Sequence, residues 1–595
     1  MNGFIDYLNS TNNLGGDSTG SLAETQVKSP YYNVVKIDRK IGLRISQEIN
    51  QGVYKTYILT GHAGDGKTSI LVQVLKSLQL LSDGEGLDEV HEYDSLFYVK
   101  DMSEIAEQEQ VRLLEKALNA PQNGKTGIIV SNTGPLLNSL ISLAVQQKTN
   151  NGATLSSKER IELQSRILTQ LDQNEDKEIE VAGYKLTLVN IARVDNVFFA
   201  RKILQKILNP QLWEKCEGCA AKTKCPIINN QRLLLAQVER VGAFVDNYYR
   251  FLYENDKRMT IRQMVGQISY GITGNLTCEK VCNKMLKEPF FTYNFANLFF
   301  GYKGLSLKPD SKQIKGIEHI QGLGLDRIAL DVDYKLFVNQ DYSFFTDNVR
   351  PIIDDLSKKS RKHFQVTEAA LESRKNQQTE TAKLRSAVRR FYLIYGIDTE
   401  EHKISDMYNQ IYGANYIDYK KMITSVQPSA MTRRMQNVVY NALYIKNTGF
   451  LPATSSDILL PLTLRREDEV YQSVLLVLGE VNKSDIKIVT KKVNNQLEDS
   501  EDKYDLFIQL KDAKFRLTLP MVNYFNNLIA GAVTSNNNPS LSHGIAALDT
   551  LLLEKYGDVN PGSGEDCEIS VIVNTIQGQK IRRFDFVGNK LHLVD

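Results

Sequence analysis

The spacing of apolar residues changes twice along this chain of 595 residues. From residue 31 to about residue 200, short apolar runs such as 57–60 and 96–99 alternate with helical patterns such as 69–81. This alternation predicts a parallel α/β sheet. Between about 200 and 450, apolar residues recur every three or four positions, as in 384–394, which predicts helices. Beyond residue 450 the period falls to two, which predicts a separate α+β unit.

The strongest chemical pattern follows the first apolar run. Residues 61–68 satisfy G-x-x-x-x-G-K-[ST], with a strand pattern before them and an amphipathic helical pattern after them. Glycines let backbone N–H groups surround phosphates, and the start of a helix adds partial positive charge. We expect Lys67 to reach the β- and γ-phosphates of ATP and Thr68 to bind Mg²⁺. The predicted phosphate-binding residues are Gly61, His62, Ala63, Gly64, Asp65, Gly66, Lys67, Thr68 and Ser69.

Hydrolysis also requires a carboxylate for Mg²⁺ and a group that orients water. Asp101 follows the apolar run 96–99, and Glu104 lies three residues later. We assign Asp101 to the metal, together with Thr68, and Glu104 to the water. The alternative is that Asp101 simply caps the next helix.

The order of the strands complicates this assignment. Many P-loop ATPases of the AAA type carry their acid on the third strand, whereas 96–99 is the second run and the third, 127–132, ends in hydroxyls and amides. Asn190 ends a later run and is a candidate sensor of the γ-phosphate, or a strand-end residue without that role. Arg262 begins a helical pattern in a predicted lid and could reach the nucleotide, because arginine forks onto phosphate oxygens. The alternative for Arg262 is a surface position.

Three of the six cysteines lie within ten residues, as Cys216, Cys219 and Cys225. Thiolates at this spacing can hold a structural Zn²⁺ if a fourth ligand joins them. We assign Cys278 as that ligand, with Cys282 as the substitute. Free thiols and an iron–sulfur cluster remain alternatives.

Charge is nearly balanced along the chain, with a net charge of +2 and a pI near 8.0. This balance excludes a strongly basic protein that coats nucleic acid, so any contact with DNA must be local. The residues 358–363 and 374–390 concentrate positive charge, and Arg389 and Arg390 beside aromatic residues are candidate DNA contacts. A solvated helix face is the alternative.

No apolar run of about 18 residues is present, and the first residues lack the pattern of a signal peptide. We therefore expect a cytoplasmic protein with no membrane partner. The predicted fold is an α/β P-loop NTPase core with a helical lid, followed by a helical domain and a C-terminal α+β domain. The expected boundaries are a flexible segment at 1–30, the ATPase domain with the cysteine knuckle at 31–245, the lid at 246–350, the helical domain at 351–450 and the α+β domain at 451–595.

Three motifs together resemble the DptF (DndF) family, the ATPase component of phosphorothioation-dependent restriction in bacteria. They are the loop at 60–68, the acidic strand at 96–104, and the cysteines at 216–225 followed by Cys278. The resemblance is best over the first 280 residues. It implies an ATPase that acts with other restriction-complex subunits on duplex DNA lacking phosphorothioate marks.

The leading hypothesis is therefore an ATP-hydrolysing subunit of an antiviral DNA-restriction complex, with ATP, Mg²⁺ and structural Zn²⁺ as ligands and homo-oligomers possible. A second hypothesis is a scaffold ATPase whose nucleotide controls oligomerisation and protein recruitment without DNA. A third is a nucleotide-binding protein with negligible hydrolysis.

Overall fold

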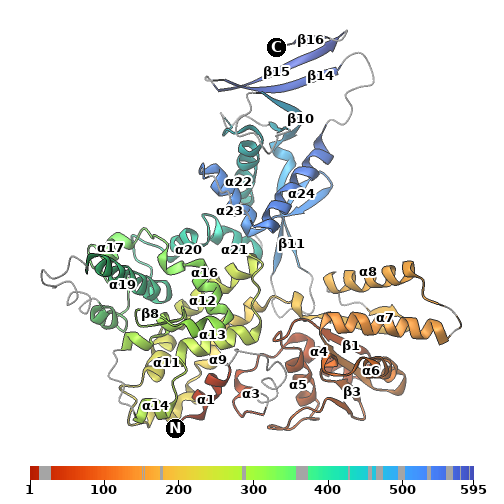
Figure 1. Cartoon of the computed structure of the whole chain (residues 1–595), viewed down its shortest axis with the longest axis vertical. Helices are drawn as coiled ribbons and strands as arrows, with labels where there is room; N and C mark the ends of the chain where they lie inside the picture. Colours follow the sequence, from red (N-terminus) through yellow and green to blue (C-terminus); the bar gives the residue numbers. More distant parts are fainter. Residues whose placement is uncertain are drawn as a thin grey trace. The chain divides into compact units, whose positions relative to one another are not determined.

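The computed structural model divides into two compact units (Figure 1). The first includes Met1–Ile404, and the second consists of Ser405–Asn494 and Asp502–Asp595. The division falls inside the predicted helical domain of 351–450. No helix among the described residues has the length and apolar character needed to cross a bilayer. The described residues are 1–12, 28–150, 152, 154–173, 178–283, 290–356, 373–425, 429–452, 459–463, 474–493, 503–532, 538–557, 567–575, 578–587 and 590–594.

A six-stranded sheet organises the first unit, in the order β2-β3-β4-β1-β6-β5. The four inner strands run parallel, and the two edge strands pair antiparallel to their neighbours. The carboxyl ends of the parallel strands therefore meet at one edge of the sheet, where open α/β sheets bind ligands. The strands are β1 (Thr56–Thr60), β2 (Val90–Glu92), β3 (Leu96–Val99), β4 (Thr126–Ser131), β5 (Glu178–Val181) and β6 (Tyr184–Asn190).

Both faces of this sheet are covered, which explains why the inner strands read as continuous apolar runs. Side chains alternate along β1, so that Tyr57 and Leu59 join one core and Ile58 joins the other. The first core includes α4 (Lys40–Asn50) and α5 (Lys67–Ser77). The second includes α6 (Glu107–Asn119), α7 (Thr133–Asn150) and α8 (Ser157–Gln173). The predicted parallel α/β sheet is confirmed.

The rest of the first unit is mostly helical. Its longer helices are α9 (Ala200–Ile207), α11 (Pro226–Ala236), α12 (Val238–Glu254), α13 (Ile261–Thr273), α16 (Lys315–Leu323) and α19 (Ser373–Tyr395). Shorter ones are α3 (Tyr32–Val35), α10 (Glu214–Glu217), α14 (Cys278–Asn283), α15 (Phe295–Leu298) and α17 (Asp333–Phe337), with a small hairpin of β7 (Tyr302–Lys303) and β8 (Ser306–Leu307).

The N-terminal helix α1 (Gly3–Ser10) is packed into this helical region and contacts α13. Phe4 is fully buried and meets the ring of Trp213 edge-on at a centroid distance of 5.5 Å. The residues 1–12 are thus folded, within the segment 1–30 whose later part, from residue 11, is expected to be flexible. The residues 13–27 of that segment lie outside the described residues.

The second unit combines helices with antiparallel sheets, as the two-residue period predicts. A five-stranded sheet has the order β16-β15-β14-β10-β9, and a three-stranded sheet has the order β11-β12-β13. Helix α22 packs on β9 and β11. The helices are α20 (Ile404–Tyr412), α21 (Tyr416–Thr424), α22 (Ser429–Thr448), α23 (Leu519–Ile529) and α24 (Pro539–Tyr556). The strands are β9 (Leu459–Thr463), β10 (Val474–Asn482), β11 (Ile486–Lys492), β12 (Tyr504–Leu510), β13 (Ala513–Arg516), β14 (Cys567–Thr575), β15 (Gly578–Val587) and β16 (Lys590–Leu593).

Candidate functional site

The loop between β1 and α5 requires glycine at three positions. Gly61, Gly64 and Gly66 have φ angles of +147°, +88° and +92°, in the region that side chains disfavour. Space is also restricted, because a Cβ atom on Gly64 would lie 3.0 Å from the hydroxyl of Thr260. The glycine spacing in the sequence therefore encodes the conformation of this loop.

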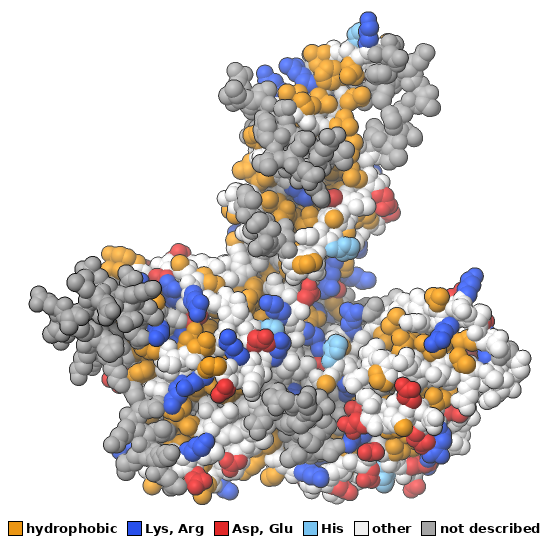
Figure 2. Space-filling view, in the orientation of Figure 1, with side chains coloured by type: hydrophobic (Ala, Val, Ile, Leu, Met, Phe, Trp, Pro, Cys, Tyr) orange, Lys and Arg blue, Asp and Glu red, His pale blue; other side chains and the backbone are white. Residues whose placement is uncertain are grey.

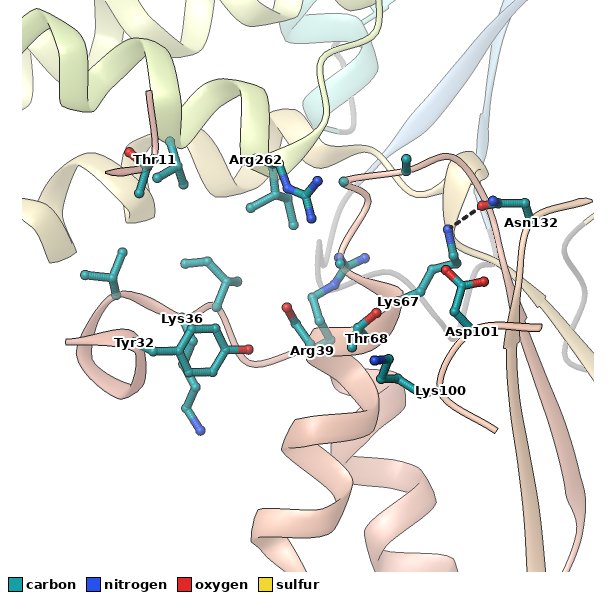
Figure 3. Close-up of a pocket in the computed structure, with 18 of the residues that line it drawn as sticks. Thr11, Tyr32, Lys36, Arg39, Lys67, Thr68, Lys100, Asp101, Asn132 and Arg262 are labelled. Carbon is teal, nitrogen blue, oxygen red and sulfur yellow. Dashed lines mark hydrogen bonds between the residues drawn. The ribbon is translucent and has the colours of Figure 1, made fainter. Parts of the chain in front are cut away.

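Helix α5 starts directly after Gly66, which caps it without a side chain. The first N–H groups of a helix have no partner within the helix and carry its positive dipole end. They face a cavity of about 330 Å³ that Ala63, Gly64, Gly66, Thr68 and Ser69 help to line (Figure 3). This arrangement suits a bound anion such as phosphate.

Lys67 is 6% exposed and is the first residue of α5. Its ammonium group donates hydrogen bonds of 3.0 Å to the carbonyls of Gly61 and His62 and to Oδ1 of Asn132. Burial lowers the pKa of Lys67, and the carboxylates of Asp101 and Asp65 oppose that shift. The three acceptors use the full donor capacity of an ammonium group and hold it at the loop.

Asp101 caps a short helix, as its alternative interpretation predicts, and it also lines the cavity. Its carboxylate caps the short helix η1 (Met102–Glu104) by accepting hydrogen bonds from the backbone N–H, at 2.9 Å, and from the hydroxyl of Ser103. It also lines the cavity with Thr68, as does the exposed Glu104. The structure thus brings together the residues assigned to the metal and to the water.

The order of the strands in space differs from their order in sequence. Strand β4 lies between β1 and β3, so Asp101 is separated from the loop after β1 by one strand. Asn132, which follows β4, fills the intervening position (Figure 3). Its Oδ1 accepts from Lys67, and its Nδ2 donates to the Ser103 hydroxyl at 3.0 Å. Asn132 therefore links Lys67 to the segment of Asp101, a role that the sequence alone does not reveal because it depends on the order of the strands in space.

Asn190 does not lie in the cavity. Its Oδ1 caps the short helix η3 (Ile191–Arg193) by accepting from the N–H of Ala192 at 3.1 Å. Its Nδ2 donates to the carbonyl of Leu171 at 3.0 Å. These bonds fit the alternative interpretation of a strand-end residue.

Arg262 does reach the cavity, from the first turn of α13 (Figure 3). Thr260 and Gln263 form a capping box that fixes the start of this helix. Burial lowers the pKa of Arg262 below its usual value. The arginine therefore faces the loop between β1 and α5 from a capped helix end.

The cavity is rich in positive charge. Among the described residues that line it, five are cationic (Lys36, Arg39, Lys67, Lys100 and Arg262) and two are acidic (Asp101 and Glu104). Arg39 is 2% exposed, and its guanidinium lies 4.6 Å from the centre of the Phe199 ring. Of these five cations, only Lys67 and Arg262 have a role predicted from the sequence.

The opposite part of the cavity is largely apolar and aromatic. Tyr7 of α1, Tyr32 and Val35 of α3, and Ile37 line it together with Val265 of α13. Burial raises the pKa of the Tyr32 hydroxyl, so this group is neutral at physiological pH. The cavity thus combines an anion-binding end with a surface suited to a flat, uncharged group.

No family model, curated protein or solved structure matches this chain.

The predicted zinc ligands lie in one neighbourhood at the N-terminal helix. The backbone N–H and the side-chain amide of Asn2 donate, at 3.4 Å each, to the sulfurs of Cys278 and Cys216. Burial raises the pKa of the Cys216 and Cys225 thiols, and Cys278 adds to both shifts. In the part of the chain that the structure describes, however, no three histidine, cysteine or acidic residues are arranged to hold a metal. A zinc site remains a prediction.

Cys219 and Cys282 belong to the same neighbourhood. Burial raises the pKa of Cys282, and Cys219 and Cys278 add to the effect. None of the five described cysteines of the first unit forms a disulfide bond.

Arg389 and Arg390, the candidate DNA contacts, are both paired with acids of the fold. Arg390 is fully buried and pairs with Asp326 at 2.9 Å, and Arg389 forms a two-pronged ion pair with Asp333. Their counter-charges lie more than 50 residues away in the sequence, so the basic pattern could not reveal them. On the face shown in Figure 2, Lys and Arg side chains are interspersed with Asp and Glu over the first unit. The basic residues 358–363 lie outside the described residues.

Proposed function

We propose that this chain binds ATP with Mg²⁺ in the cavity at the start of α5 and hydrolyses it. The observation that carries the proposal is the convergence of Lys67, Thr68 and Asp101 with the positive end of a helix in one cavity. A strongly anionic ligand is favoured, because the cations that line the cavity outnumber its acids.

The loop N–H groups and Lys67 bind the phosphates. Lys67 then exchanges the loop carbonyls, its present acceptors, for phosphate oxygens. Thr68 and Asp101 would hold Mg²⁺, since hydroxyl and carboxylate oxygens are its usual ligands. When bound, the metal supplies charge neutralisation on the phosphate oxygens.

Hydrolysis requires water to attack the γ-phosphorus while the bond to the β-phosphate oxygen breaks, releasing ADP and phosphate. Glu104 is exposed at the cavity and accepts a hydrogen bond from that water. Asn132 keeps Lys67 and the acidic segment in register through its two hydrogen bonds. Arg262 stabilises negative charge that develops on the transferred phosphoryl group.

The nucleoside occupies the apolar part of the cavity. A planar base fits against Tyr32 and the aliphatic side chains of Val35 and Val265. Segments from α1, α3 and α13 therefore enclose the ligand, which supports a site formed by the P-loop core and the helical region together.

For the biological setting we propose the role implied by the sequence resemblance, an ATPase subunit of a bacterial DNA-restriction complex. The support for it is the set of motifs quoted above. Arg389 and Arg390 add no support, because both are paired with acids of the fold. The rival setting is an ATPase switch that controls oligomerisation without DNA. Stimulation of turnover by DNA separates the two.

The test is ATP hydrolysis by the purified chain and by Lys67→Ala, with and without duplex DNA. Lys116→Ala is the matched control, because this lysine lies on the exposed face of α6 and pairs with Glu92 at 2.8 Å. Turnover that is lost only in Lys67→Ala supports the ATPase. Turnover equal in both variants would refute it, and indifference to DNA would favour the switch.

The zinc proposal has its own test. Elemental analysis after native purification is expected to give about one zinc per chain. Cys216→Ser should lose that metal, whereas Cys567→Ser, a change in the second unit, should retain it. A zinc content far below one per chain in the wild type would overturn the proposal.

A further inference from the structure

The phosphate loop contains an acid that the function proposed above does not use. Asp65 is fully buried within the loop, next to the glycine that precedes Lys67. A buried carboxylate at this place repels a triphosphate and costs free energy unless it is paired. A buried Asp65 therefore requires a cationic or hydrogen-bonding partner.

The partner is Arg258, in the connection between α12 and α13. Its Nη1 donates to Oδ1 of Asp65 at 2.7 Å. The other carboxylate oxygen accepts the backbone N–H of His62 at 3.0 Å. Both carboxylate oxygens of Asp65 thus accept hydrogen bonds, one from His62 inside the loop and one from Arg258 outside it.

Arg258 also reaches the segment that follows β6. Its Nη2 donates to the carbonyls of Ile191 at 3.1 Å and Val194 at 3.3 Å. The guanidinium therefore joins the phosphate loop, the end of a central strand and the connection that leads to α13. One planar group with several donors suits this task, which a lysine could not perform with the same geometry.

The connection continues directly into the residue that faces the phosphates. The backbone N–H of Arg262 lies 3.5 Å from the carbonyl of Gly64, and Thr260 is packed against the same glycine. A shift of Gly64 on binding phosphate would therefore move Thr260 and Arg262 at the start of α13. The same link works in reverse, because coupling between two sites is reciprocal.

We propose that the Asp65–Arg258 ion pair is a positioning device that locks the phosphate loop to α13, so that Arg262 meets the phosphates when ATP binds. This inference rests on the proposed ATP site and deepens it. The pair neutralises the acid within the loop, and it ties the anion-binding element to the helix that completes the site.

Two effects of the pair can be measured separately. Removing Arg258 alone leaves the Asp65 charge buried beside Lys67, whose pKa it influences, and should weaken ATP binding. Removing both partners takes away the charge and the link together. Binding should then recover, whereas turnover should stay low because Arg262 is no longer held.

The experiment compares Arg258→Gln, Asp65→Asn and the double variant in the full chain. Affinity is measured with a fluorescent ATP analogue, turnover by phosphate release, and folding by thermal unfolding without nucleotide. Arg258→Gln should weaken binding roughly 30-fold, the scale for breaking a buried charge pair. The double variant should bind within about 5-fold of the wild type yet turn over roughly 10-fold more slowly, as expected when an oriented group is lost.

Arg112→Gln is the matched control, because Arg112 forms an exposed pair with Glu109 on α6. This substitution should change neither ATP affinity nor turnover. The proposal is overturned if the double variant loses as much binding free energy as the two single variants together. It is also overturned if the double variant turns over ATP at the wild-type rate. If Arg258→Gln does not fold, Asp65→Asn and the double variant still test the proposal. It predicts that turnover falls more than ATP affinity in the double variant. Absence of ATP binding in the wild type would remove the proposed function and this inference together.

Discussion

Two arginines of the first unit show how similar residues acquire different roles. Arg390 on α19 is fully buried, with Asp326 at 2.9 Å, Asn297 at 3.0 Å and the Tyr302 ring beneath it at 3.7 Å. Arg262 on α13 lines the cavity. Burial lowers the pKa of both, but at Arg390 the carboxylate of Asp326 opposes the shift.

The two arginines differ in what neutralises their charge. The charge of Arg390 is neutralised within the fold, so it contributes to packing and to the position of α19. Arg262 faces a cavity that holds an excess of positive charge, and an arriving polyanion supplies the neutralisation. Changes to these two regions should therefore separate stability from activity.

The largest expected effect is on the acid of the cationic cavity. Asp101→Asn should lower ATP turnover roughly 100-fold, because an amide binds Mg²⁺ poorly and does not neutralise its charge. Asparagine is as good a helix cap as aspartate, so the thermal midpoint should stay unchanged. Phosphate release and thermal unfolding measure the two effects. Normal turnover with an unchanged thermal midpoint would mean that Asp101 is only a cap.

The next effect contrasts the two arginines directly. Arg262→Gln should reduce turnover roughly 30-fold, the range for one stabilising donor, without destabilising the free protein. Arg390→Gln should instead lower the free energy of unfolding by about 3–5 kcal/mol, because Asp326 is left buried without its partner. Denaturant unfolding of both variants gives the comparison. A reversed pattern would assign Arg262 to structure and Arg390 to the ligand.

A smaller effect is expected at the hydrogen-bonded link next to Lys67. Asn132→Ala should reduce turnover about 10-fold, since Lys67 and the Asp101 segment lose their common partner. Asn132→Asp tests the sign of charge, because a second acid should hold Lys67 more tightly and weaken ATP affinity. Equal turnover in wild type and Asn132→Ala would show that the link has no part in catalysis.

The smallest effect is expected at the neighbour of Arg390. Arg389→Gln breaks a partly exposed pair with Asp333 and should cost about 1 kcal/mol of stability. Binding of duplex DNA at low salt should not change. A clear loss of DNA retention in this variant, with stability intact, would restore the original interpretation of the basic stretch.

Features that depend on local patterns could be predicted from the sequence. Local patterns were sufficient for the parallel sheet, the glycine-rich loop and the two-residue period of the second unit, because each depends on neighbouring residues. Asp101 and Arg262 were placed correctly at the cavity, since one ends a strand and the other begins a helix. These positions follow from the elements themselves.

What the sequence could not show depends on long-range pairing. Asn132 became recognisable only when β4 was found between β1 and β3. The partners of Arg389 and Arg390 come from segments about 56–64 residues earlier, so a basic run looked available when it was neutralised. Asn190 occupied the end of an inner strand, yet two backbone bonds turn it away from the cavity.

The most direct measurement is equilibrium binding of ATP and Mg²⁺ to the purified chain and to Lys67→Ala by isothermal titration calorimetry. The account predicts saturable binding of one ATP per chain in the wild type and at least about 10-fold weaker binding in the variant, because a buried cation that contacts phosphate is lost. Binding that is absent from the wild type, or equal in the two proteins, would contradict a phosphate site at the start of α5.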